Sequence, residues 1–175
     1  LSYTDYSAGN VSGFGSYDSG NWNFTGYARD MSAKGVHVDT LSGNAESTNG
    51  VTNISYVTGT MGNGAFTASG VYSDQGMNIK AEAGNIDMGQ FPGLAGIPVS
   101  GTASLTADIH GTPQQPQADV IFNASDGAIK GAAFNTLKGR LTADEKTLTI
   151  SDAKWTGDSE NHTVKGTIGL SLIHI

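Results

Sequence analysis

The stretch that decides the fold is Val99-Ser100-Gly101-Thr102-Ala103-Ser104-Leu105-Thr106-Ala107-Asp108-Ile109-His110. Small or apolar residues occupy its odd-numbered positions, and Ser, Thr, Asp and His occupy the even-numbered ones. This alternation is typical of a β-strand with one buried face and one wet face. At ~3.3 Å per residue, the run predicts a strand about 35 Å long.

Shorter runs of the same pattern begin at Phe66, Met77, Val120 and Val164. No window has apolar residues at the helical spacing i, i+3, i+4, i+7, so the sequence predicts an all-β protein. Turn signals separate the runs. They are Gly43-Asn44, Asn49-Gly50, Gly62-Asn63-Gly64, Asp126-Gly127 and Asp144-Glu145-Lys146.

The composition of the 175 residues fits this fold class and excludes several functions. Only 37% of the residues are hydrophobic and 14% are charged, and the chain holds 25 Gly. The net charge is −7, and the 9 Lys and Arg form no cluster, which argues against a nucleic-acid partner. The chain has no Cys, so disulfides and thiolate metal sites are excluded.

The chain also resembles itself at an offset of 96 positions. Without gaps, residues 28–70 match residues 124–166 at 12 of 43 positions. The identical pairs include Asp30/Asp126, Gly35/Gly131 and Gly43/Gly139. A long ungapped match indicates tandem structural units, and it predicts that the two glycine pairs lie at matching turns or bulges.

The repeat suggests a division of the chain into four parts. We expect residues 1–25 to end a preceding β-unit, 26–90 to form one repeat unit and 91–170 to form a second. The run from Phe91 to Pro98 is interpreted as a connector into the next long strand. The last six residues, 170–175, resemble the translation of a sequencing-adaptor end. We therefore expect the chain to be a gene fragment and residues 171–175 to be an artefact.

No arrangement of residues in the sequence predicts catalysis. The four histidines lie far apart, without the close spacing and nearby carboxylate of a metal site, and are interpreted as solvated. They are His37, His110, His162 and His174. The run from Gly59 to Gly64 lacks the Lys of a phosphate loop and is read as a hairpin turn. We expect a protein that is not an enzyme and that has no cofactor and no metal.

From Pro98 onward, the order of short motifs resembles the TamB/AsmA-like family of bacterial envelope proteins. The motifs are Val99–Leu105, Ile109-His110-Gly111-Thr112 with Pro113 and Pro116, Gly127–Gly131, Leu148-Thr149-Ile150 and Lys165–Ile168. The resemblance covers about residues 26–170, because the first repeat copy carries the same pattern more weakly. The sequence lacks the family's membrane anchor and its far C-terminal region, so the resemblance is to a middle slice.

The resemblance implies an open, curled β-sheet trough, β-taco-like, built from tandem repeat units. In such proteins an apolar groove carries phospholipid acyl chains through the periplasm between inner and outer membranes. Neighbouring repeats of the same chain would be partners, and some members relate to an outer-membrane assembly protein. We expect the full-length protein to be anchored in the inner membrane. The residues expected to line the groove are Val99, Ala103, Leu105, Ala107, Ile109, Val120, Phe122, Leu148, Ile150, Val164 and Ile168.

The alternative is an extracellular adhesin or autotransporter passenger, which also favours Ser, Thr, Asn and Gly strands and lacks Cys. A β-solenoid adhesin has repeats of roughly 20–30 residues with stacked turns. The 96-residue period and the long alternating strands favour the trough.

Overall fold

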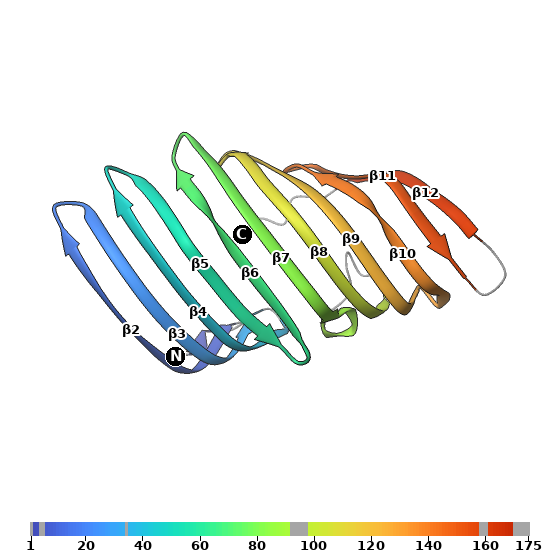
Figure 1. Cartoon of the computed structure of the whole chain (residues 1–175), viewed down its shortest axis with the longest axis horizontal. Helices are drawn as coiled ribbons and strands as arrows, with labels where there is room; N and C mark the ends of the chain where they lie inside the picture. The colour runs from blue at the N-terminus through green and yellow to red at the C-terminus, as the bar shows by residue number, and fades with distance from the viewer. Residues whose placement is uncertain (1, 4–5, 34, 92–97, 158–160, 170–175) are drawn as a thin grey trace.

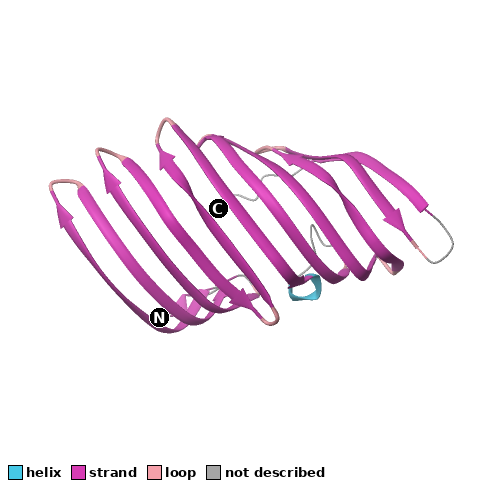
Figure 2. Ribbon diagram, viewed as in Figure 1, coloured by secondary structure: helices cyan, strands magenta, loops and turns pink. Residues whose placement is uncertain are grey.

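A computed structural model describes residues 2–3, 6–33, 35–91, 98–157 and 161–169. Within these residues the chain is almost entirely β-strand, with one 3-10 turn and no α-helix (Figure 2). The strands are β1 (Ser2–Tyr3), β2 (Tyr6–Asp18), β3 (Asn21–Ala33), β4 (Val36–Thr48), β5 (Val51–Met61), β6 (Gly64–Ser73), β7 (Gly76–Asp87), β8 (Val99–Thr112), β9 (Gln115–Ile129), β10 (Ala132–Ala143), β11 (Thr147–Thr156) and β12 (Asn161–Gly169). The 3-10 turn η1 (Met88–Gln90) follows β7.

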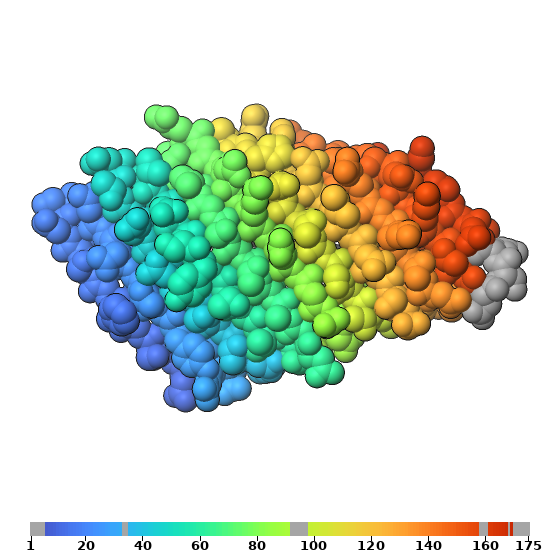
Figure 3. Space-filling view, viewed as in Figure 1, coloured from blue at the N-terminus to red at the C-terminus, as the bar shows by residue number. Residues whose placement is uncertain are grey.

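The twelve strands form one open antiparallel sheet in which every strand pairs with its neighbours in sequence. Figure 1 shows the long strands side by side in a single layer, each bowed along its length. In the space-filling view the strands follow one another in sequence order across the visible face (Figure 3). The prediction of an all-β protein with long alternating strands is confirmed; the run starting at Val99 forms β8, which has 14 residues.

One face of the sheet is apolar from β2 to β12, and we call it the apolar face. Strand register brings its side chains into rows that cross the strands. The central row contains Gly13, Gly26, Gly43, Val57, Ala68, Ala81, Ala107, Val120, Leu141, Ile150 and Gly166. A flanking row contains Val11, Ala28, Leu41, Gly59, Phe66, Ala83, Leu105, Phe122, Gly139, Ala153 and Val164. The other face carries mostly Ser, Thr, Asn and charged residues, and we call it the polar face.

The strand arrangement is repeat-like at the same offset of 96 residues. Ala28 faces Leu41 as Ala124 faces Leu137, and Gly43 faces Val57 as Gly139 faces Ala153. The register shift between Ile54 and Val57 recurs between residues 150 and 153. Strands β3–β6 thus correspond to β9–β12 in order, register and bulge position.

The predicted turns are partly right. Asn49-Gly50, Gly62-Asn63 and residues 144–146 connect strands, as expected. Gly35 and Gly131 occupy matching turns, with φ of 82° and 83°.

Gly43-Asn44 and Asp126-Gly127 are wrong as turn predictions, because both pairs lie inside strands. Gly43 and Gly139 occupy equivalent positions in β4 and β10. In each strand the register shifts directly after the next residue, which is Asn44 in β4 and Arg140 in β10. Asp126 adopts φ 51° within β9, and Asp30 has the same φ within β3.

Few side chains are fully enclosed. The buried apolar residues of the described chain are Ala28, Met61, Ile86, Ala124, Phe134 and Ala153. Phe134 is the largest of them, and its ring meets Trp155 edge to face, with the centroids 5.4 Å apart. Most of the apolar face is therefore half-buried, with no second layer of described chain covering it.

Candidate functional site

The structure brings most of the predicted groove residues together on the apolar face. In β8 and β9, Leu105 faces Phe122 and Ala107 faces Val120. Ile150 faces Leu141 of β10, whose other neighbour is Val120. Leu148 faces Ile168, whose side chain lies outside the described set.

These predicted residues are half-buried rather than enclosed. Intermediate exposure is found at nine of them: Val99, Ala103, Leu105, Ala107 and Ile109 in β8, Val120 and Phe122 in β9, and Leu148 and Ile150 in β11. Val164, in the edge strand β12, is 37% exposed. The set therefore forms a continuous apolar surface that remains accessible from one side.

An apolar concavity lies at the other end of the sheet, over β2–β5, and has a volume of about 420 Å³. Gly26 and Gly43 face each other at its base. The ring of Phe24 lies against Gly26, where a Cβ atom would be only 2.4 Å from it, so this position has room only for glycine. Bulkier side chains form the walls; they are Val11, Leu41, Ile54, Val57, Trp22 and Phe24. We call this concavity the glycine-floored groove. Its volume falls within the ~300–1,000 Å³ of small-molecule sites.

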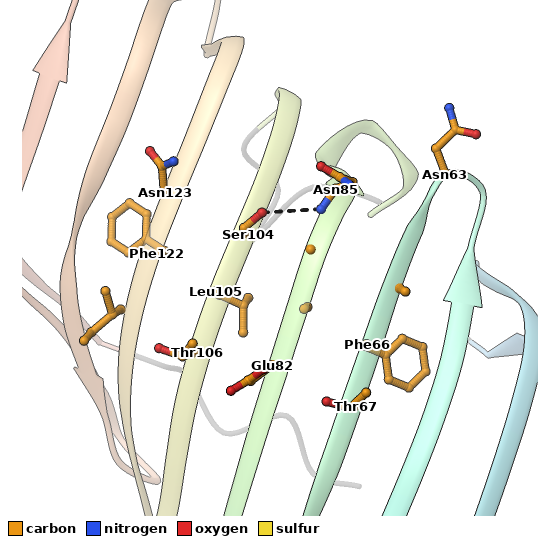
Figure 4. Close-up of a pocket in the computed structure, with 14 residues that line it drawn as sticks. Asn63, Phe66, Thr67, Glu82, Asn85, Ser104, Leu105, Thr106, Phe122 and Asn123 are labelled. Atoms are coloured by element: carbon orange, nitrogen blue, oxygen red, sulfur yellow. Dashed lines mark hydrogen bonds between the residues drawn. The ribbon is translucent and has the colours of Figure 1, made fainter.

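A second concavity of about 520 Å³ crosses β6–β9 (Figure 4). Its lining mixes Phe66, Leu105 and Phe122 with polar residues that alternate with them along the strands, such as Thr67 and Glu82. Ser104 Oγ accepts a hydrogen bond from the Asn85 backbone N–H at 3.4 Å beside it. Leu105 lies in this concavity between Ala83 and Phe122, on the apolar face.

Sequence reasoning missed the glycine-floored groove. In β2 and β3 the inward positions include Gly13, Gly15 and Gly26, and these glycines interrupt the apolar alternation of residues such as Val11 and Trp22. The available signal was the match between positions 28–70 and 124–166. That match maps β4 and β5, at one side of this groove, onto β10 and β11, but it starts at Ala28 and leaves β2 and most of β3 without a matched counterpart.

Charges lie on the polar face and at the turns. Arg29 donates a hydrogen bond to the Tyr27 hydroxyl and lies over its ring, and this bond raises the pKa of Arg29. At the β10–β11 turn, the backbone N–H groups of Lys146 and Thr147 donate to Asp144 and hold its pKa below the usual range.

The described histidines lie apart from one another and do not form a cluster. His37 Nε2 lies 3.2 Å from Asp39 Oδ1 on the exposed surface, His110 is half-buried in β8, and His162 is exposed in β12. His174 lies outside the described residues. Among the side chains that the structure describes, no three His, Asp or Glu residues lie close enough to hold a metal ion.

Comparison of the chain with protein-family models, with curated proteins and with solved structures gives no match. None of the helical residues described here forms a span that is long and apolar enough to cross a membrane.

Proposed function

We propose that this chain is a segment of a non-enzymatic lipid conduit, whose apolar face carries the acyl chains of phospholipids. The observation behind the proposal is the apolar face itself. It extends across the sheet from β2 to β12, and no described segment covers it. Soluble proteins rarely expose a large contiguous apolar surface unless something binds there.

The energetics favour a flexible apolar ligand. Burying a methylene group contributes about 0.8 kcal/mol, so enclosing a chain of about 16 carbons contributes roughly 12 kcal/mol. An open sheet face contacts the ligand from one side only, which leaves about half of that gain. Such binding is sufficient to hold an acyl chain and weak enough to let it move along the face.

Within this proposal, the repeat-like arrangement reflects two tandem units. The first unit, residues 26–90, contains most of β3 and all of β4–β7, and the second, residues 91–170, contains β8–β12. Stacked units extend an apolar face without interruption. The sheet is then part of a curled trough.

The place of action is proposed from the family resemblance alone. A TamB/AsmA-like protein anchored in the inner membrane would carry phospholipid through the periplasm and support outer-membrane biogenesis together with an assembly protein. The adhesin alternative is less compatible with this fold in its solenoid form, because β-solenoids stack parallel strands whereas this sheet is antiparallel.

The first test is the lipid itself together with Leu105→Asp. Native mass spectrometry of the purified wild type should detect bound phospholipid. Leu105 is half-buried between Ala83 and Phe122, so a carboxylate there stays hydrated at an open face. The variant should keep a melting temperature near that of the wild type and lose most of its lipid.

The matched control is Thr106→Asp, which places the same charge one residue along β8 on the polar face. It should retain wild-type lipid occupancy. Absence of phospholipid from the wild type, or equal lipid loss in the two variants, would contradict the proposal. Unfolding of Leu105→Asp alone would instead indicate that the face is sealed in a core, because an unpaired buried carboxylate costs several kcal/mol.

A further inference from the structure

Two Asn-Gly dipeptides lie at successive hairpins of the sheet, and their surroundings differ. Asn49-Gly50 forms the whole turn between β4 and β5. In Asn63-Gly64, only Asn63 belongs to the turn between β5 and β6, and Gly64 is already the first residue of β6. Because the dipeptide is the same at both places, a difference in its chemistry comes from the fold.

An asparagine that precedes glycine can react with its own backbone. The glycine nitrogen attacks Cγ of the asparagine and forms an N–C bond, while the N–H proton and the side-chain amide nitrogen leave as ammonia. Water then opens the resulting succinimide ring. Opening at Cγ gives Asp, and opening at the main-chain carbonyl carbon gives isoaspartate, whose chain runs through the former side chain. Glycine favours the attack because it has no Cβ beside the nitrogen.

The reacting atoms at Asn49-Gly50 are accessible. Both residues are exposed, and among the described residues only chain neighbours come within 4 Å of where a Cβ on Gly50 would lie. Their φ values of 52° and 77° are those of a type I′ turn, in which the flanking Thr48 and Val51 form the closing pair and the Gly50 N–H stays outside the ladder. The Asn49 N–H donates to Asn21 Oδ1 at 3.0 Å, a bond that involves neither the Gly50 nitrogen nor the Asn49 side chain.

The nitrogen at Asn63-Gly64 is held in place. Gly64 is buried, and a Cβ there would lie 2.7 Å from both the Asn85 carbonyl oxygen and Ile86 Cδ1. Gly64 also pairs with Met61 across the turn. The N–H of the residue that closes such a turn donates to the carbonyl oxygen of the residue before it. Attack by this nitrogen would require the ladder to break.

We propose that Asn49 is a site of spontaneous deamidation and isoaspartate formation, and that the fold protects Asn63 from the same reaction. Attack requires Cγ of Asn49 to approach the Gly50 nitrogen, so the turn must open. An exposed hairpin tip opens locally at little cost, whereas the start of β6 opens only with its packing. This inference concerns a turn and does not depend on lipid binding.

The product changes the end of the β4–β5 hairpin. Isoaspartate adds a methylene to the main chain of a two-residue turn, and a type I′ turn does not accommodate it without moving the closing pair. The next pair is Ser47 with Thr52, and Thr52 lines the glycine-floored groove. Modification of Asn49 therefore loosens this end of the groove.

The test ages the full chain in a mildly alkaline buffer and follows both asparagines by peptide mapping, with fragmentation that separates Asp from isoaspartate. Product should accumulate severalfold faster at position 49 than at position 63. In concentrated urea the two positions should react at similar rates, because both precede glycine. Equal rates in the folded chain, faster reaction at Asn63, or an inert Asn49 in a chain that reacts in urea would overturn the proposal. A difference in urea as large as in buffer would also overturn it, since the local sequence would then explain the difference.

Asn49→Gln is the matched control, because the longer side chain closes the ring far more slowly. Ageing should leave this variant without isoaspartate at position 49 and with the wild-type rate at Asn63. Hydrogen exchange over residues 46–53 should become faster in the aged wild type than in its fresh sample, and should not change in the aged variant. Equal loosening in both proteins, or none in a wild type that carries isoaspartate, would overturn the assigned effect on the hairpin.

Discussion

Phe134 is 2% exposed in a molecule where most apolar side chains are half-exposed. Its ring contacts Trp155, and it also approaches Gly127 closely. A Cβ at Gly127 would lie 2.6 Å from the ring and 2.1 Å from the Ser100 carbonyl oxygen. Gly127, which resembled a turn signal, is therefore required because the Ser100 backbone and the Phe134 ring both approach it closely. A single sequence does not distinguish these two uses of glycine.

Replacing Phe134 tests how much stability this small cluster supplies. Phe134→Ala should reduce the free energy of unfolding by about 3 kcal/mol, because truncating a buried aromatic ring leaves a cavity. Phe14→Ala removes the same atoms from a ring that is 74% exposed and should change it by less than about 0.5 kcal/mol. Urea denaturation measures both. Similar losses in the two variants would contradict this account of the cluster.

At the scale of the elements, bulges keep the apolar residues on one face. In β5, both Ser55 and Tyr56 lie between Ile54 and Val57, whose partners in β6 are only two residues apart. Gly84 and Asn85 of β7 interrupt its ladder with β8 in the same way. Alternation with a period of two residues predicted regular strands such as β8. It does not reveal a bulge, where one extra residue enters the strand and the apolar side chains on both sides of it stay on the same face.

Two single-residue deletions separate a bulge from a regular strand. Deleting Ser55 removes the extra residue and leaves Ile54 and Val57 on the apolar face, so we expect a loss of about 1 kcal/mol. Deleting Thr67 from β6, which has no register shift with β7, must turn half of that strand over. That deletion should cost several kcal/mol in thermal or chemical unfolding. Equal losses of stability in the two deletion variants would show that Ser55 is not the extra residue of a bulge.

At the scale of the whole molecule, the open face gives the protein a larger solvent-accessible area than a compact protein of the same mass. The solvent-accessible area is 11218 Å² for a mass of 18.0 kDa. A compact monomer of this mass has about 8,000 Å². The sequence anticipated this in part, since a chain with few hydrophobic residues and many glycines has little material for a second layer. The sequence does not indicate where the glycine-floored groove lies, because Gly13, Gly26 and Gly43 interrupt the apolar alternation there.

The excess area predicts an unusual denaturation slope. Because much apolar surface is already exposed in the folded state, unfolding exposes about one sixth less area than for a compact protein of this size. The urea m-value scales with that area and should be lower by a similar fraction. A slope typical of a compact 175-residue protein would mean that the face is covered in solution.

The pairing of every strand with its sequence neighbours also determines how the chain acquires its structure. Each strand added to the sheet closes only a short loop, and the entropic penalty of closure grows slowly with loop length. Contacts are therefore local in sequence, which favours rapid folding for an all-β chain. Formation can begin at any hairpin and proceed strand by strand, without waiting for distant segments. The sheet can thus grow in the order in which the ribosome delivers its strands.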